Sequence, residues 1–178
     1  MRQPGLNDIE TRYLHPGEIC ICAHSVKVIT VLGSCVSITM FNSRLQMGAI
    51  CHATLPRCRS VKEECIKPCI DAFKYTDCAI HHMLRAFSDR GIMNSEIEIK
   101  LFGGADTLNS RSSNAIGSQN IRTALHVIRK EKLSVAAADV GDSFGRKLIF
   151  FTRTGEVFLK RLRNGNGLPA GNGRAFLR

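Results

Sequence analysis

The chain has 178 residues, 44% of them hydrophobic, which is enough for one domain with a real core. No apolar run approaches the roughly 18 residues that span a bilayer, and the polar residues 1–10 lack the apolar segment of a signal peptide. We therefore expect a cytoplasmic protein with no membrane insertion, whose eight cysteines are reduced.

Apolar runs in the first third predict four strands, over residues 18–23, 26–32, 36–41 and 47–53. The polar segment Asn42–Gln46 joins the last two strands into a hairpin. If Ser43 and Arg44 are the central residues of a tight turn, counting back along the ladder places Cys35 directly opposite His52. A shift of register would change this pairing, so the prediction depends on the turn.

Helical spacing appears twice in the middle of the chain. Thr76 is a plausible N-cap for a helix that ends near Gly91, with apolar residues at i, i+3, i+4 and i+7: Ile80, Met83, Leu84 and Phe87. An alternating strand of residues 97–101 then leads into Gly103-Gly104. Ser118 can cap a second helix with the apolar positions Ile121, Ala124, Leu125 and Ile128.

The last third predicts strands over residues 133–140, 146–152 and 156–162, with Arg146 and Lys147 as an exposed pair. Residues 164–173, rich in Gly, Asn and Pro, predict disorder. We therefore expect a single domain over residues 1–163 and a disordered basic tail over 164–178. Many strands with two helices predict the α+β class.

Cys35 and His52 would form a thiol–imidazole pair of the kind that hydrolases use. A thiolate is the nucleophile, and a neighbouring imidazolium can hold it ionised and then protonate a leaving amine. Gly33 would let the backbone approach a substrate or adopt a positive φ. Amides near Ser34 and Cys35 could face an oxyanion. The alternative is a buried structural cysteine beside a core histidine.

Charge and the remaining cysteines suggest other classes of function. A net charge of +10 can indicate nucleic-acid binding, but only 6% of residues are aromatic and they do not alternate with basic ones. We therefore expect no nucleic acid, and either an acidic protein partner or a solvated tail. The cysteines at 58, 65, 69 and 78, near His81 and His82, could hold a metal, but their spacing fits no usual ligand pattern.

An ordered set of motifs is similar to the chemoreceptor glutamine deamidase family, CheD. The set covers roughly residues 19–161, most of the chain. Its members are Leu32–Val36, His52–Pro56, Tyr75–Ile80, Phe102–Ala105, Ile116–Asn120, Asp139–Gly141, Gly145–Lys147 and Thr154–Val157.

The resemblance implies a β-sandwich core of cysteine-hydrolase type with helices packed outside. It implies a protein-glutamine deamidase with Cys35 as nucleophile, His52 as its partner and a preceding threonine that supports the histidine. Thr30 is the nearest candidate, although its facing depends on the register. Gly103 and Gly104 would wall the substrate site.

No cofactor or metal is implied. The expected partners are methyl-accepting chemoreceptors and a CheC-type phosphatase. The alternative is a non-enzymatic adaptor that binds the same partners, which would need neither Cys35 nor His52.

Overall fold

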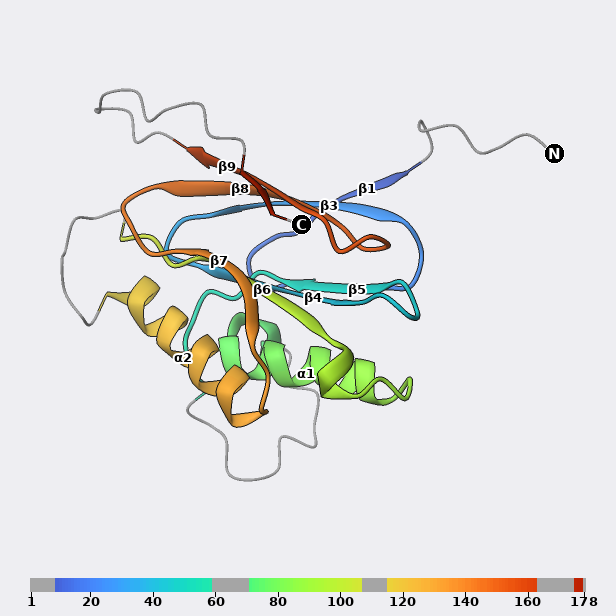
Figure 1. Cartoon of the computed structure of the whole chain (residues 1–178). Helices are drawn as coiled ribbons and strands as arrows, with labels where there is room; N and C mark the ends of the chain where they lie inside the picture. The colour runs from blue at the N-terminus through green and yellow to red at the C-terminus, as the bar shows by residue number, and fades with distance from the viewer. Residues whose placement is uncertain (1–8, 59–70, 107–114, 163–174, 178) are drawn as a thin grey trace.

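Two β-sheets and a layer of two helices make up the computed structural model, which describes residues 9–58, 71–106, 115–162 and 175–177 (Figure 1). The first sheet has the strand order β1-β3-β8-β9-β10 and the second β2-β5-β4-β6-β7. Both sheets are mixed, because β1 runs parallel to β3 and β6 parallel to β7. The α+β class predicted from the sequence is confirmed.

The strands are β1 (Glu10–Tyr13), β2 (Ile19–Cys22), β3 (Val26–Leu32), β4 (Val36–Asn42), β5 (Met47–Cys51), β6 (Glu98–Gly103), β7 (Val135–Val140), β8 (Gly145–Phe151), β9 (Val157–Leu162) and β10 (Ala175–Leu177). The helices are α1 (Thr76–Ser88) and α2 (Ile116–Lys130), with short 3-10 turns at Ala72–Lys74 and Asn94–Glu96. β1 and β10 were not predicted. β10 lies within the predicted tail, where it pairs with β9, and most of that tail lies outside the described residues.

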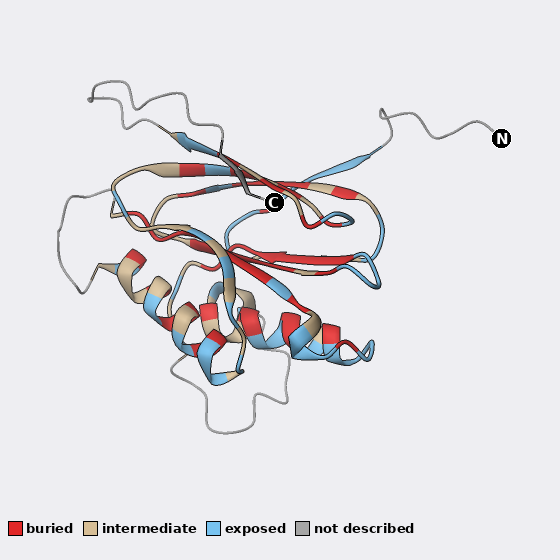
Figure 2. Ribbon diagram, viewed as in Figure 1, coloured by how far each residue is buried: buried red, intermediate tan, exposed pale blue. Residues whose placement is uncertain are grey.

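Two apolar clusters lie between the layers, as the buried residues of Figure 2 show. One fills the space between the two sheets and contains Val28 and Leu32 of β3 and Ile50 of β5. The other joins the second sheet to the helices and contains Ile38 of β4 and Met83 of α1. The middle of the second sheet is therefore covered on both faces, which explains why β4 and β5 are almost wholly buried.

The two helices follow their predicted patterns to different degrees. In α1 the four predicted apolar positions are all buried, although the helix begins at Thr76 itself, whose hydroxyl donates to the Leu55 carbonyl at 2.9 Å. In α2 the predicted cap is wrong, because Ser118 lies inside the first turn and Ala115 is the N-cap. Its buried face also includes the polar residues Asn120 and Thr123.

Candidate active site

The hairpin of β4 and β5 sets the relation between Cys35 and His52. Its connection has four residues, with Gln46 at φ 48°, and the ladder pairs Asn42 with Met47. The predicted two-residue turn is therefore wrong, and Cys35 is not directly opposite His52. The bridge between Val36 and Ala53 confirms the observed register.

A shift of two positions leaves the facing of both side chains unchanged, because side chains alternate with a period of two. Cys35 and His52 therefore share one face of the second sheet as diagonal neighbours, a relation with a typical Cα separation of about 7–8 Å. That face looks toward the first sheet, since Cys35 packs against the cluster between the sheets.

Thr30 reaches His52 from the opposite sheet. It lies on β3 in the inward-facing row with Val28 and Leu32, whereas Val31 is 54% exposed. Thr30 Oγ1 lies 2.8 Å from His52 Nδ1 and 2.9 Å from the Leu14 carbonyl oxygen. The sequence could not decide whether this threonine faced inward, and the structure places it in contact with the imidazole.

These contacts determine the tautomer of His52. A carbonyl can only accept, so the single hydroxyl proton of Thr30 goes to Leu14. Thr30 Oγ1 then accepts the Nδ1 proton of His52, which leaves Nε2 as the bare nitrogen. Nε2 is buried and has no hydrogen-bond partner among the described residues. The imidazole thus presents an unpaired acceptor on the face that it shares with Cys35.

Burial favours the neutral forms of both candidate residues. It lowers the pKa of His52, against weaker opposing effects from the Leu14 carbonyl and Glu18. Burial also raises the pKa of Cys35, partly offset by a hydrogen bond from its own amide. Burial therefore favours a thiol and a neutral imidazole at neutral pH over the thiolate and imidazolium that the sequence suggested.

Gly103 and Gly104 pack against the backbone of Cys35. Both have positive φ, 99° and 68°, and the Gly104 amide donates to the Cys35 carbonyl at 2.7 Å. A Cβ at Gly103 would collide with that same carbonyl oxygen. Gly33 does not have a positive φ, and its carbonyl accepts the Ala105 amide at 2.9 Å. Gly103 and Gly104 therefore allow close backbone packing around Cys35.

Asn120 joins the segment that precedes β4, which carries the candidate nucleophile, to the segment that follows β5. Its side-chain amide donates to the Ser34 and Thr54 carbonyls, both at 3.1 Å. By the register of the Val36–Ala53 bridge, Thr54 lies opposite Cys35. The residue is fully buried on α2, so this helix holds the Ser34 and Thr54 segments together beside Cys35. The sequence analysis assigned Asn120 no role, although its position in the Ile116–Asn120 motif could have identified it as a residue near the site.

Ser37 is a second residue that the sequence analysis missed. It follows Val36, so the same register places it opposite His52. Val36 and Ala53 exchange two backbone hydrogen bonds of 2.9 Å, so the next pair is of the non-hydrogen-bonded type, whose side chains lie closer. Ser37 Oγ is buried and has no partner among the described residues. Only the register identifies this serine, since no motif does.

The sequence predicted that Arg146 and Lys147 are both exposed, and for Arg146 the prediction is wrong. Its side chain is fully buried, and Nε donates to Asp139 at 2.6 Å. Nη1 donates to the carbonyls of Gly141 and Phe144. Arg146 faces inward because alternation along β8 places it in the row of Leu148 and Phe150. Lys147 is exposed, as expected.

Some of the cysteine cluster lies outside the described residues, namely Cys65 and Cys69. Within the described part, no group of three or more potential ligands is placed to hold a metal. Cys20 and Cys22 approach to 3.5 Å between their sulfur atoms. Cys51 is fully buried in the core under the helices.

Neither helix of the described structure is long and apolar enough to cross a membrane.

Comparisons with known proteins agree with the motifs. Residues 59–161 match the family model described as CheD chemotactic sensory transduction. A probable chemoreceptor glutamine deamidase CheD 2 of Geobacter sulfurreducens is 48% identical over 151 residues, which are 84% of this chain and 89% of the relative. The corresponding protein of Maridesulfovibrio salexigens is 40% identical over 161 residues, 88% and 94% of the two chains. On this similarity, the chain belongs to the CheD family.

Proposed function

We propose that this chain is a protein-glutamine deamidase that hydrolyses glutamine side chains of chemoreceptors to glutamate and releases ammonia. The relatives named above are probable chemoreceptor glutamine deamidases, which supports the substrate class. The observation that carries the mechanism is the bond between Thr30 and His52, because it leaves Nε2 unprotonated on the face of Cys35. We also propose that the chain has a cysteine-hydrolase fold, lies in the cytoplasm and binds a CheC-type phosphatase.

Catalysis begins with transfer of the Cys35 proton to His52 Nε2 as the sulfur attacks the carboxamide carbon of a glutamine. This order follows from the neutral resting pair, in which the thiol must lose its proton during attack. Backbone amides at Ser34 and Cys35 stabilise the oxyanion of the tetrahedral intermediate. The distance between sulfur and imidazole closes when substrate binds, as is common for catalytic hydrogen bonds.

The imidazolium then donates its proton to the departing nitrogen, which leaves as ammonia. A γ-glutamyl thioester remains on Cys35. His52 takes a proton from water, the water oxygen attacks the thioester carbon, and the thiol is released with that proton. The products are glutamate and the original enzyme, so the cycle needs no cofactor. Thr30 keeps Nε2 available in every step by accepting the Nδ1 proton.

The test is mass spectrometry of a chemoreceptor cytoplasmic fragment incubated with the protein. We expect specific glutamines to show the mass change of an amide nitrogen replaced by oxygen, with release of ammonia. Cys35→Ala should abolish this change while thermal unfolding stays near wild type, and Cys58→Ala, at another partly exposed cysteine, should retain activity. Deamidation by Cys35→Ala protein, or none by wild type, would overturn the proposal.

A further inference from the structure

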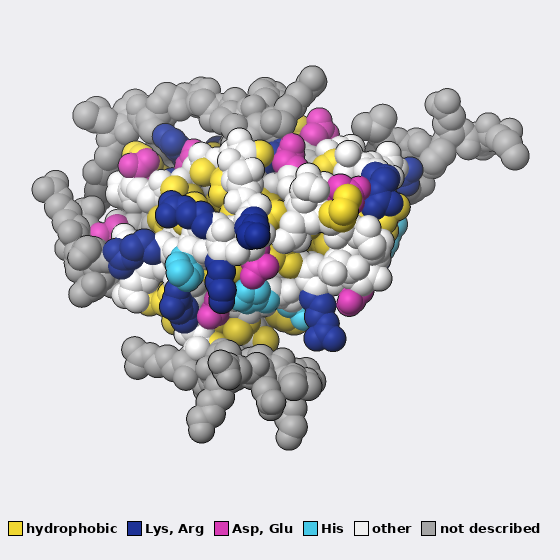
Figure 3. Space-filling view, turned by 60° about the horizontal axis from the view of Figure 1, so that its bottom comes forward, with side chains coloured by type: hydrophobic (Ala, Val, Ile, Leu, Met, Phe, Trp, Pro, Cys, Tyr) yellow, Lys and Arg dark blue, Asp and Glu magenta, His cyan; other side chains and the backbone are white. Residues whose placement is uncertain are grey.

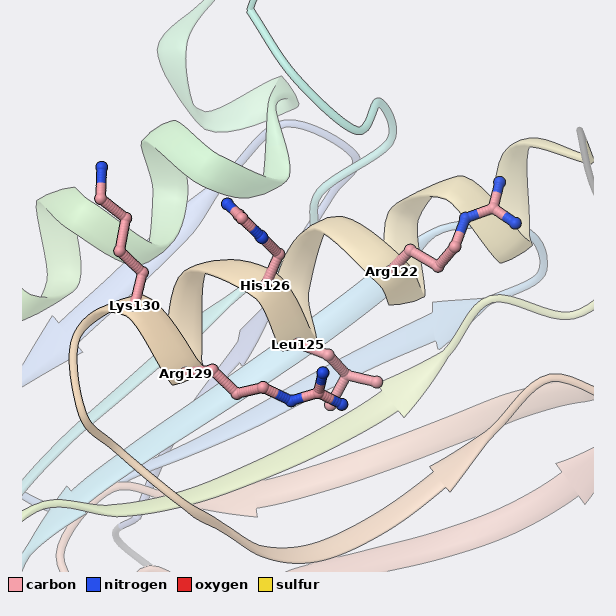
Figure 4. Close-up of a pocket in the computed structure, with 5 residues that line it drawn as sticks. All are labelled: Arg122, Leu125, His126, Arg129 and Lys130. Carbon is pink, nitrogen blue, oxygen red and sulfur yellow. The ribbon is translucent and has the colours of Figure 1, made fainter.

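The exposed face of α2 carries a row of basic side chains. Arg122, His126 and Lys130 are spaced i, i+4 and i+8 and are all exposed. Figure 4 shows these three projecting from one side of the helix, with Leu125 and Arg129 on the other. At 1.5 Å per residue, the row extends about 12 Å along the helix axis.

Arg57 extends this row toward the candidate active site. Two adjoining hollows, of about 470 and 550 Å³, share Arg122 and His126, and the second is also lined by Pro56 and Arg57. Arg57 lies three residues after Thr54, whose carbonyl Asn120 holds beside Ser34. We call Arg57, Arg122, His126 and Lys130 the basic stripe. It runs from the edge of the site along the outside of α2.

The charged side chains that line the two hollows are basic. Among the described residues that line the two hollows, none is a carboxylate. In the view of Figure 3, which brings the helix layer forward, several Lys and Arg side chains lie near histidines, with a few Asp and Glu side chains among them. Like charges at i and i+4 on a helix repel one another, so the row does not gain stability from its own spacing. They raise the local potential for an anionic partner.

We propose that the basic stripe binds an acidic segment of the protein substrate next to the glutamine that is deamidated. This inference rests on the proposed function. A linear row of charges about 12 Å long matches carboxylates along one face of a helix of similar length. The lining favours a protein segment over nucleic acid, because among its described residues only His126 is aromatic.

A charge-reversal pair tests the proposal. Arg122→Glu/Lys130→Glu changes the net charge by −4, and Lys147→Glu/Lys160→Glu makes the same change on two exposed lysines that face each other across β8 and β9. The probe is the chemoreceptor cytoplasmic fragment, used at low and high salt. At low salt we expect the α2 variant to raise KM about tenfold with kcat nearly unchanged. The KM of the control variant should stay near that of wild type. High salt should remove the difference in KM between the α2 variant and wild type.

Direct binding separates this proposal from the proposed function. With Cys35→Ala present in every protein, Kd for the same fragment is measured without turnover. If these proteins bind the fragment but the protein with Cys35 intact does not deamidate it, the result counts only against the enzyme activity. Arg122→Gln/Lys130→Gln should weaken binding by an intermediate amount if reversal has not disturbed the fold. Equal Kd for the α2 variant and the control would overturn the proposal. So would tight binding of a random-sequence oligonucleotide that only the α2 variant loses.

Discussion

Replacing Thr30 with valine tests the tautomer of His52 with little change in shape. The variant loses the hydroxyl that lies 2.8 Å from Nδ1 and 2.9 Å from the Leu14 carbonyl. The Nδ1 proton then has only that carbonyl, at 3.5 Å, which is too long for a good hydrogen bond. Leaving a buried donor without a partner costs about 1–3 kcal/mol.

The imidazole can avoid this cost by moving its proton to Nε2, but that tautomer cannot accept the proton of Cys35. The catalytic tautomer therefore becomes less favourable by about 1–3 kcal/mol. This corresponds to a fall in kcat/KM of about 5- to 150-fold. Thr30→Ser keeps the hydroxyl and should retain most of the activity.

The assay follows glutamate formation on the receptor fragment by mass spectrometry, with thermal unfolding measured for each variant. Loss of activity in Thr30→Val should exceed any loss explained by unfolding at the assay temperature. Activity of Thr30→Val within twofold of wild type would refute the reasoning. A serine variant as inactive as the valine variant would show that the hydroxyl is not what matters.

Three further predictions concern pH, packing and charge. Because burial lowers the pKa of His52 below its usual 6.5, its base form predominates at neutral pH. The acid limb of kcat/KM should therefore have its midpoint below pH 6.5, and a midpoint above that value would contradict the assignment. Asn120→Asp should reduce kcat more than Asn120→Ala, because a carboxylate would face two carbonyl oxygens; the reverse order, measured on folded proteins, would argue against the bridging role. Asp139→Ala should lower the free energy of unfolding by about 3 kcal/mol, because Arg146 would become a buried charge without its counterion. Arg161→Ala should lower it by under about 1 kcal/mol, because Arg161 is half exposed. Equal losses for the two variants in denaturant titrations would show that burial of Arg146 is not the cause.

Sequence alone predicted most of the elements and the chemical groups of the candidate site. Within the described residues, local periodicity identified both α-helices and eight of the ten strands, because alternation and helical spacing are properties of neighbouring residues. Motifs pointed to Cys35 and His52 as a pair. β1 lacked such a signal, since its four residues are all exposed.

Tertiary structure decided how these groups meet. The length of the hairpin connection set the register, which moved Cys35 from opposite His52 to a diagonal position without changing its face. Stacking of the two sheets brought Thr30 to the imidazole and buried Arg146 against Asp139. Asn120 reached Ser34 and Thr54 only because α2 packs on the second sheet. Each of these contacts joins segments distant in the chain, and local sequence patterns contain no information about which distant segments pack together.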